Sequence, residues 1–326
     1  MKKTSLKQIA EIAQVSVATV SYALNDSSQV GEVTKAKIKK IAADLNYVPN
    51  LSAQNLRTND SNIVCAVVNT YQGNFNGDVI QEIQDIFAQK KYQLLAVSGS
   101  IPNFVKTDMV DGLIVLNYRS DEAELRRIAY DLHKPTIFMT NEIAAKKTAN
   151  VIINNELGIK YLFETLSKSV HRNICIITGD NNSYNSQQRL KAARKYYKKF
   201  YKHDDFDSHV YSGDFDPNTT YQLGRHFLEQ NTYNAYLCFN DDMALGIYHA
   251  ASSLNKTVGE DLSVVGFDDS YVSSVVSPGL TTIKVNKKTW AEEVVDQYFK
   301  IKSNSNYPET IELIPELILR DSVKLK

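Results

Sequence analysis

The sequence is poor in cysteine and has no long apolar run. Its three cysteines, Cys65, Cys175 and Cys238, are scattered over 326 residues, which fits neither a disulfide framework nor a zinc site. Each lies within a short apolar run typical of a strand, so we expect three buried free thiols. No apolar run follows a basic N-terminus, and no stretch reaches about 18 apolar residues. We therefore expect no signal peptide, no membrane span and a cytoplasmic protein.

Signatures of catalysis are also missing. The six histidines have no metal-ligand spacing, and the chain has no Gly-x-Ser-x-Gly, P-loop or Gly-x-Gly-x-x-Gly motif. The adjacent acids Asp241-Asp242 and Asp268-Asp269 are not read as acid–base pairs, because neighbours in sequence usually point apart. We expect a binding protein and not an enzyme, with no catalytic residue, no metal and no cofactor.

Charge is unevenly distributed along a chain whose formal net charge is zero. Residues 1–58 contain more basic than acidic side chains. Their basic side chains are Lys2, Lys3, Lys7, Lys35, Lys37, Lys39, Lys40 and Arg57, against the acids Glu11, Asp26, Glu32 and Asp44. A basic segment on a neutral body suits a module that faces phosphates.

The N-terminal segment has the periodicity of two short helices joined by a tight turn. The first helix is predicted with one apolar face formed by Leu6, Ile9, Ala10 and Ala13. Ser16 is placed to cap the second helix, because its hydroxyl can accept a hydrogen bond from a first-turn N–H. Val20 and Leu24 then face inward, and residues 13–15 are left as the turn.

A third amphipathic run covers residues 34–45. Its apolar face consists of Ile38, Ile41, Ala42 and Leu45, and its other faces carry Lys35, Lys37, Lys39 and Lys40. Three short helices around a small core are compatible with a structural cap that binds nothing. The tight turn favours a helix-turn-helix, in which the second helix enters the major groove while the first crosses the DNA backbone. We therefore predict double-stranded DNA as a partner.

From residue 62 onward, short apolar runs alternate with longer helical patterns. The first series has strands at 63–68, 92–97, 112–116 and 136–139, and helices at 78–89 and 121–132. The second has helices at 156–166, 186–200, 219–229 and 241–253, and strands at 173–178, near 210, at 235–239 and at 263–267. Such alternation is typical of βαβ units and of parallel sheets covered by helices. We predict an α/β core of two similar lobes.

Several segments closely resemble the lactose/galactose repressor (LacI/GalR) family. They are Leu6–Ala13, Val15–Ser21, Asn25, Leu45–Asn50 and Ala53–Leu56, and in the core Asn240–Gly246 and Val264–Asp269. The resemblance implies an α-helical helix-turn-helix head on a periplasmic-binding-protein-like α/β core with parallel sheets. It also implies three chain crossings between the lobes, with late segments returning to the first lobe before the chain ends near residues 317–320.

On this basis we expect a DNA-binding domain over residues 1–58, with a hinge helix at about 50–57. An effector-binding and dimerisation core follows over residues 61–326. Lobe 1 is expected to cover about 61–153 and 286–312, and lobe 2 about 154–285 and 313–326.

One region departs from the family pattern. The connection between the strand ending near residue 98 and the strand at residues 110–114 has too few residues for a full crossover helix. In the resembling family this lobe forms much of the dimer interface. We therefore expect the packing there to be rebuilt around Ile101, Phe104, Val105 and Met109.

The resemblance implies that Val17 and Ala18 read bases, with Tyr22 one turn later. Many family members carry Arg at the position of Tyr22. Because Arg can bind guanine O6 and N7 with two hydrogen bonds and Tyr cannot, the operator sequence stays open. The polar side chains interpreted as contacts to the DNA backbone are Ser16, Thr19, Ser21 and Asn25. The alternative for them is ordinary helix surface.

A short segment after Pro49 is interpreted as the hinge. Proline pre-forms a turn, and a following helix of barely two turns is too short to be stable alone in water. The resemblance implies that this segment, with Asn50 and Ala53, pairs across a dimer in the minor groove. It also implies that Leu56 wedges between the central base pairs. Alternatively, Leu56 is a linker residue that packs on the core.

Five side chains follow predicted strand ends or open the helix that comes next, where open α/β sheets bind ligands. They are Asn154, Arg189, Phe215, Asn240 and Asp268. A sugar needs such a set, because its hydroxyls accept charge-assisted hydrogen bonds of about 1.5–3 kcal/mol and its C–H face packs on an aromatic ring. The resemblance agrees at all but Asn154, where the family often has Asp. The alternatives are turns or helix caps, a surface salt bridge at Arg189 and a core aromatic at Phe215.

We therefore predict a homodimeric repressor of carbohydrate-utilisation genes that a small sugar releases from a pseudo-palindromic operator. Closing two lobes around the sugar would change the spacing of the two DNA-binding heads. A regulator controlled by a protein corepressor or by a nucleobase is the alternative. The identity of the effector, the sign of its action, the operator sequence and the choice between dimer and tetramer stay open.

Overall fold

A computed structural model describes residues 5–47, 60–71, 74–116, 121–303 and 309–326. The chain divides into two compact units, residues 1–61 and residues 62–326. The hinge helix predicted at about 50–57 lies outside the described residues. No helix in the described ranges is long and apolar enough to cross a lipid bilayer.

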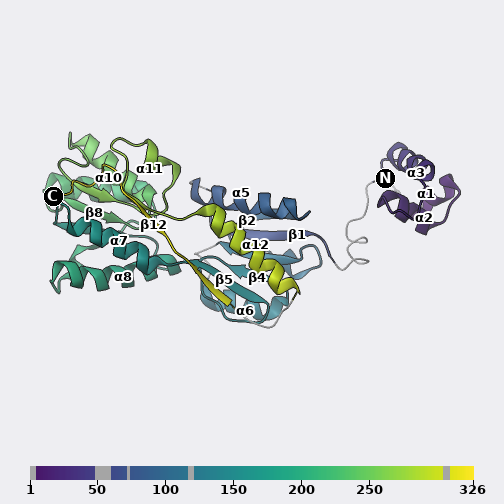
Figure 1. Cartoon of the computed structure of the whole chain (residues 1–326), viewed down its shortest axis with the longest axis horizontal. Coiled ribbons are helices and arrows are strands. Elements are labelled where there is room, and N and C mark those ends of the chain that lie inside the picture. Colours follow the sequence, from purple (N-terminus) through teal and green to yellow (C-terminus); the bar gives the residue numbers. More distant parts are fainter. Residues whose placement is uncertain (1–4, 48–59, 72–73, 117–120, 304–308) are drawn as a thin grey trace. The chain divides into compact units, whose positions relative to one another are not determined.

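The N-terminal unit is a bundle of three helices, α1 (Leu6–Ala13), α2 (Val17–Leu24) and α3 (Glu32–Asp44) (Figure 1). Gln14 ends α1 in the left-handed conformation, with φ +57°, and Ser16 caps α2 by accepting from the N–H of Thr19 at 3.0 Å. The buried apolar residues between the helices are Ile9, Ala10, Ala13, Val20, Ala23, Val30, Ile38 and Ala42. The predicted helix-turn-helix, with its turn and cap, is confirmed.

One side chain of α3 departs from the predicted pattern. Lys35 was expected on a polar face, but it is only 7% exposed. Its ammonium donates to Glu32 Oε1 at 2.6 Å, one turn earlier. The long aliphatic part of a lysine can lie against an apolar surface while its charged end reaches a carboxylate, which explains the burial. The expectation of a solvent-facing Lys35 is therefore wrong.

The first lobe of the core unit is built on a six-stranded parallel sheet in the order β11-β5-β4-β3-β1-β2. Its strands are β1 (Ile63–Val68), β2 (Gln93–Ser98), β3 (Gly112–Leu116), β4 (Thr136–Phe138), β5 (Thr148–Ile153) and β11 (Glu309–Leu313). The last of these comes from the far end of the chain, as the resemblance implied.

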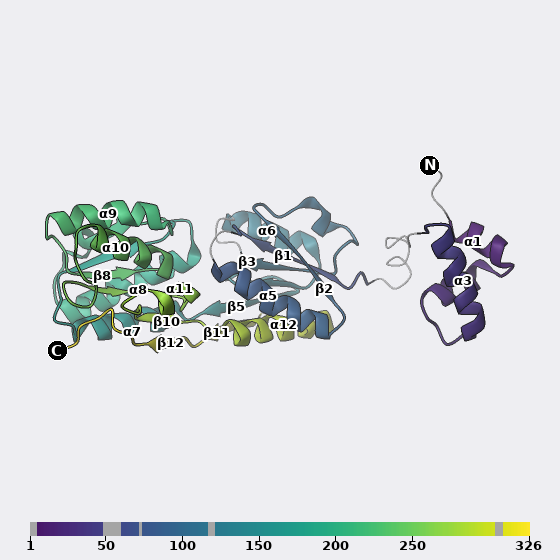
Figure 2. The same ribbon diagram turned by 90° about the horizontal axis from the view of Figure 1, so that it is seen from above.

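Helices cover both faces of this sheet (Figures 1 and 2). Helices α5 (Asn74–Gln89) and α12 (Lys287–Ser303) pack on one face, and α6 (Glu122–Leu132) packs on the other. Side chains alternate along β1, so Val64 belongs to the first cluster and Cys65 to the second. Burial on both faces explains why these strands have nearly continuous apolar sequences.

The second lobe contains a four-stranded parallel sheet in the order β7-β6-β8-β9. Its strands are β6 (Ile174–Thr178), β7 (Val210–Ser212), β8 (Ala235–Cys238) and β9 (Ser263–Val265). Its helices are α7 (Asn155–Ser167), α8 (Tyr184–Tyr201), α9 (Pro217–Glu229), α10 (Asp241–Ser253) and α11 (Tyr271–Val275). A separate antiparallel pair joins β10 (Thr282–Lys284) to β12 (Glu316–Ile318).

The chain passes between the lobes three times, from β5 to α7, from β10 to α12 and from β11 to β12. The first and third crossings are joined by a hydrogen bond from the N–H of Asn154 to the carbonyl of Leu313 at 3.0 Å. Trp290, near the start of α12, donates to the carbonyl of Val151 in β5 at 2.7 Å. These bonds link all three crossings to the end of β5.

A short 3₁₀ helix, η1 (Asn103–Lys106), stands between β2 and β3 in place of a full crossover helix. Val105 is buried there, and Ile101 and Phe104 pack against the same apolar cluster. Met109 was expected to join them, but it is 54% exposed. Instead, Lys134 reaches into the segment and donates to the carbonyls of residues 105, 107 and 110.

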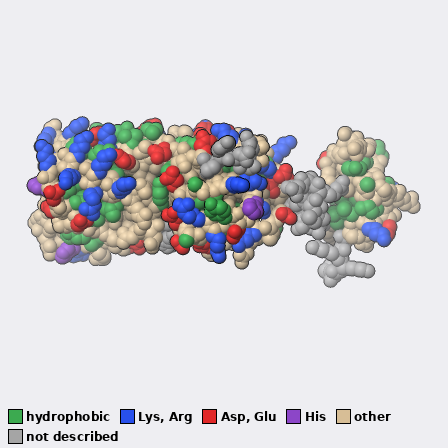
Figure 3. Space-filling view, turned by 90° about the horizontal axis from the view of Figure 1, so that it is seen from below, with side chains coloured by type: hydrophobic (Ala, Val, Ile, Leu, Met, Phe, Trp, Pro, Cys, Tyr) green, Lys and Arg blue, Asp and Glu red, His purple; other side chains and the backbone are tan. Residues whose placement is uncertain are grey.

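All three cysteines are buried free thiols, as predicted. Burial raises the pKa of Cys65 to about 11, and it also raises the pKa of Cys175 and Cys238. All three sulfurs are therefore protonated at neutral pH. On the face of the core shown in Figure 3, Lys and Arg are interspersed with Asp and Glu, in keeping with a net charge of zero.

Candidate functional sites

The start of α2 is the surface that the sequence predicted to read DNA. Val17 is 45% exposed, and Ala18 is exposed beside it. Both side chains are small and apolar, so they can contact a thymine methyl but cannot hydrogen-bond a base edge. Tyr22, one turn later, is half-buried against the helical core.

The polar residues of α2 divide into two groups. The hydroxyl of Ser16 accepts from the N–H of Thr19 and lies 2.8 Å from the Thr19 hydroxyl, and Asn25 is exposed at the C-cap. Ser21 is only 9% exposed and lies on the buried side of the helix. Ser21 is therefore poorly placed for the backbone contact expected of it. Asn50, Ala53 and Leu56 lie outside the described residues.

In the core, Arg189 is the centre of the candidate effector site. It is only 3% exposed and lies in the first half of α8, whose N-cap is Ser183. Its Nε donates to Asn155 Oδ1 at 2.8 Å, and its Nη1 donates to the carbonyl of Phe239. The guanidinium carbon lies 3.5 Å from the centre of the Phe267 ring, close enough for a cation–π contact. The alternative of a surface salt bridge is excluded by this burial.

Asp268 is the ionic partner of Arg189. Its Oδ1 lies 3.8 Å from Nη2 of Arg189. The backbone of Asp268 has φ +116°, a value that costs energy for any residue but glycine, and its N–H donates to the carbonyl of Ile283 at 2.7 Å. Burial raises the pKa of this carboxyl, and the charge of Arg189 opposes that rise. This hydrogen bond thus holds the strained backbone of Asp268 against β10, while its carboxyl lies near Arg189.

Asn240 and Phe215 follow other strand ends of the same sheet. Asn240 caps α10, because its Oδ1 accepts from the N–H of Met243 at 2.9 Å. Phe215 follows Asp214 in a turn where both residues have positive φ. The Phe215 ring lies against Gly179, where an added Cβ would come within 2.0 Å of a ring carbon. Glycine at residue 179 is therefore what lets the ring approach the end of β6.

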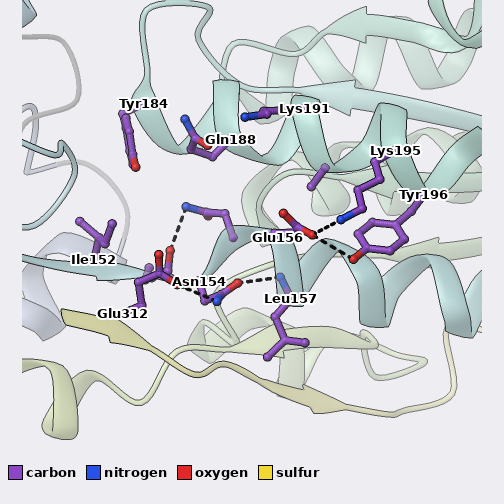
Figure 4. A pocket seen from close by; sticks show the side chains of 13 residues that line it. Ile152, Asn154, Glu156, Leu157, Tyr184, Gln188, Lys191, Lys195, Tyr196 and Glu312 are labelled. Atoms are coloured by element: carbon purple, nitrogen blue, oxygen red, sulfur yellow. Dashed lines mark hydrogen bonds and ion pairs between the residues drawn. The ribbon is translucent and has the colours of Figure 1, made fainter. Parts of the chain in front are cut away.

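Asn154 has a different set of hydrogen-bond partners. It caps α7 by accepting from the N–H of Leu157 at 2.8 Å, and its Nδ2 donates to Glu312 Oε2 at 2.8 Å (Figure 4). It lines a polar cavity of about 610 Å³ bounded by the ends of β5 and β11 and by α7 and α8, together with Tyr184 and Gln188. None of its hydrogen bonds within the described ranges reaches Arg189 or Asp268. The helix-cap alternative describes Asn154 better than the effector contact predicted for it.

Three further residues shape the site and were not singled out from the sequence. Asn155 binds Arg189, and Phe267 lies under the guanidinium. Asp241 is 1% exposed and accepts from the N–H and hydroxyl of Ser270, at 2.8 and 3.0 Å, and from the hydroxyl of Thr282 at 2.5 Å. Burial raises the pKa of Asp241 to about 7. The sequence signal that could have found them is their position, since each is the direct neighbour in sequence of a residue predicted for the site.

Two families match parts of the chain. Residues 5–50 match the family described as bacterial regulatory proteins, lacI family, and residues 163–323 match the periplasmic binding protein-like domain. The chain belongs to the LacI family of bacterial regulatory proteins. The lacI family match covers the helix-turn-helix, and the second match covers the core from within α7 to beyond β12.

Relatives of this LacI-family chain have described roles. It is 29% identical over 289 residues to a probable HTH-type transcriptional repressor, ExuR, of Bacillus subtilis (strain 168), covering 86% of each chain. It is 27% identical over 334 residues to the HTH-type transcriptional repressor PurR of Histophilus somni (strain 2336), covering 98% of this chain and 99% of that one.

A solved structure extends the likeness over the whole chain. The structure of the lac repressor dimer bound to operator and the anti-inducer ONPF matches with a TM-score of 0.81 and 25% identity, covering 99% of this chain and 100% of that one. The relatives are transcriptional repressors and not enzymes. The chain is therefore a DNA-binding transcription regulator of the LacI family.

Proposed function

We propose that this regulator is a homodimeric repressor that binds a pseudo-palindromic operator and is released by a small sugar. The observation that carries the effector part is the buried ion pair of Arg189 and Asp268 over the Phe267 ring. A buried charge pair at the ends of parallel strands is unusual unless it serves a ligand or a network. Since its target is DNA in a bacterial cell, we place its action in the cytoplasm.

The chemistry of the site favours a sugar. Asp268 supplies a carboxylate acceptor, and Asn240 has an amide nitrogen with no partner among the described residues. Phe215 supplies a half-buried aromatic ring on which the C–H face of a pyranose can pack. Hydroxyls paired with such groups bind selectively, because an analogue without them leaves buried polar atoms unsatisfied.

For DNA, we propose that Val17 and Ala18 contact base edges and that Ser16, Thr19 and Asn25 contact phosphates. The exposed, small side chains at the start of α2 allow a close approach to the groove floor. The lac repressor structure contains a dimer on an operator, which supports the same assembly here. Asn50, Ala53 and Leu56 are proposed to enter the minor groove between the two heads.

The three lobe crossings offer a route from the effector to the DNA. Asp268 is bonded to the end of β10, which leads directly into the second crossing. A change in lobe angle on sugar binding would alter the separation of two heads that must fit half-sites about one helical turn apart. We expect a coupling of about 1–3 kcal/mol, which is a fivefold to hundredfold change in operator affinity.

The test is selection of bound fragments from random DNA by the full-length protein. The selection is run alone and with D-glucose, D-galactose, D-ribose, lactose, cellobiose or a hexuronate. An inverted repeat that one of these sugars abolishes is the expected result. An inverted repeat that only adenine, guanine or hypoxanthine affects would replace the sugar with a nucleobase.

Two other outcomes contradict parts of the proposal. A repeat that no small molecule affects would contradict effector control and favour a protein corepressor. No enriched sequence at all would contradict the assignment of α2 as the DNA-reading helix.

A further inference from the structure

Asn155 lies where the chain first crosses between the lobes, as the first residue of α7 directly after β5. It is 3% exposed. Its Nδ2 donates to the carbonyl of Ile153 at 3.2 Å and to Asn185 Oδ1 at 2.9 Å, and its Oδ1 accepts from Arg189 Nε at 2.8 Å. One buried amide thus contacts the end of a first-lobe strand and two residues of a second-lobe helix.

The orientation of this amide is fixed by its partners. Arg189 can only donate and the carbonyl of Ile153 can only accept, so exchanging the oxygen and nitrogen of Asn155 would break both bonds. Both N–H donors and one acceptor site of the side chain are therefore in use. A buried amide with this arrangement resists any movement of β5 relative to α8, because such movement leaves a buried polar group unpaired.

The neighbouring residue provides a contrast within the same crossing. Asn154 has the same side chain, but it bonds to Leu157 in its own helix and to Glu312 in β11. It does not reach Arg189 through the hydrogen bonds of the described residues. Both asparagines therefore line the cavity of Figure 4, but within the described ranges only Asn155 is also hydrogen-bonded to Arg189.

We propose that Asn155 is a positioning residue that ties Arg189 to the first lobe crossing, so that an effector bound at Arg189 acts on the lobe angle through this amide. The proposal rests on the proposed function for its effector. Its geometric part, the tie between Arg189 and the crossing, stands without any ligand. A ligand that shifts the guanidinium pulls on the end of β5, and β5 is bonded to the other two crossings.

The first test needs no ligand. In the ¹⁵N-labelled, deuterated full-length protein, the Nε–H signal of Arg189 is identified by its loss in Arg189→Lys. A buried, hydrogen-bonded Nε–H exchanges slowly with water, and we expect Asn155→Ala to speed its exchange at least about tenfold.

Two further variants sharpen this test. Asn155→Asp keeps the acceptor and should keep Arg189 protected. The matched control Asn154→Ser keeps the α7 cap, loses the bond to Glu312, and should leave the Arg189 signal unchanged. An Arg189 Nε–H that stays equally protected in Asn155→Ala overturns the proposal.

The second test measures coupling with the operator and the sugar from the selection described above. For each variant, the ratio of operator affinity without and with that sugar is compared with the wild-type ratio. We expect Asn155→Ala and Asn155→Asp to reduce a fivefold to hundredfold ratio to under about twofold, because both lose the donor to the Ile153 carbonyl. Asn154→Ser should retain the wild-type ratio.

Asn155→Asp distinguishes coupling through Asn155 from a role of Asn155 in sugar binding alone. It keeps the bond to Arg189, so it should still bind the sugar by calorimetry while losing the coupling. If Asn155→Asp binds the sugar and keeps full coupling, the proposal that the effector acts through the Asn155 amide is wrong. If no sugar acts on the wild type, the effector part of the proposed function fails, and the Arg189 exchange comparison alone decides whether Asn155 holds the arginine.

Discussion

The two candidate sites differ in how they are built into the fold. At the start of α2, Ser16, Val17 and Ala18 are exposed, and the small core of the N-terminal unit lies on the other side of the helix. In the core, Arg189 and Asp241 are buried, the Asp268 side chain is only 13% exposed, and all three are bonded to neighbouring residues of the core. The comparison indicates that α2 can change specificity at little cost in stability, whereas the effector site cannot change without affecting the fold.

The largest effect is expected from removing the buried arginine. Arg189→Ala leaves the Asp268 carboxylate without its ionic partner in a buried site, so we expect a loss of about 3–5 kcal/mol in the free energy of unfolding. The control is Arg194→Ala on the same helix, whose exposed pair with Asp207 should contribute about 0–1 kcal/mol. Urea unfolding measures both. Equal losses in the two variants would remove the distinction between buried and exposed sites.

The buried acids should also make stability depend on pH. The pKa of Asp241 is raised from 3.8 to about 7, so the folded state holds its proton more tightly than the unfolded state. The stabilisation is complete below about pH 3.8 and is lost as the pH rises toward 7.

Asp241→Asn should therefore lose less stability than the wild type between these pH values. The charge of Asp241 contributes to the raised pKa of Asp268, so the difference between the two proteins contains the titration of Asp241 and its coupling to Asp268. Parallel curves of unfolding free energy against pH would contradict the assignment.

A smaller effect is expected at the aromatic residue of the site. Gly179→Ala puts a methyl group against the Phe215 ring, and overpacking of this kind costs about 1–3 kcal/mol. The ring must then move, so sugar affinity should fall while operator binding in the absence of sugar is retained. Gly77→Ala is the control, because nothing lies within 4 Å of an added Cβ there. Unchanged sugar binding in Gly179→Ala would argue against Phe215 as the packing surface.

In the N-terminal unit, a helix cap should have a modest effect. Ser16→Ala removes the acceptor for the Thr19 N–H, and loss of such a cap costs about 1 kcal/mol. Thermal unfolding of the N-terminal unit within the full chain measures it. Operator binding should weaken as well, since the start of α2 frays. Ser28→Ala, at an exposed turn residue, provides the reference.

The smallest change in stability is expected at the side chains assigned to base contact. Val17→Ala removes a side chain that is 45% exposed, so the unfolding free energy should change by less than about 0.5 kcal/mol. The sequence selected from random DNA should nevertheless change at one position of each half-site. A destabilisation as large as that expected from a core substitution such as Ile38→Ala, about 2–5 kcal/mol, would contradict the contrast between the exposed start of α2 and the buried effector site.

Much of the architecture was predictable because periodicity reports burial. The strand at 63–68 and the helix at 241–253 have the predicted bounds. Helix α5 begins at Asn74, four residues before the predicted start at 78, because its first turn has one apolar residue, Phe75, between two asparagines and a glycine and gives little periodic signal. The burial of Lys35 was missed for a related reason, since a long side chain can be covered while its charge is not.

The candidate site was less predictable, because it depends on side-chain direction at the ends of strands. Position along a strand predicts that Asn154 and Asn155 both lie near the sheet edge. It does not predict which amide turns toward Arg189, since the direction changes where β5 gives way to α7. Phe267 was read as the last apolar residue of a strand, and its contact with a guanidinium from α8 depends on tertiary packing.

Lys134 bears on how the chain acquires its shape during synthesis. Its ammonium holds the carbonyls of residues 105, 107 and 110, which precede it by 24 to 29 positions. A crossover helix in that segment would form from its own residues, whereas this segment depends on a partner that leaves the ribosome later. Non-local contacts of this kind form slowly, and exposed apolar surface is at risk of aggregation until they form. The apolar cluster that contains Val105, on the α6 side of the first sheet, therefore closes only after residue 134 has emerged.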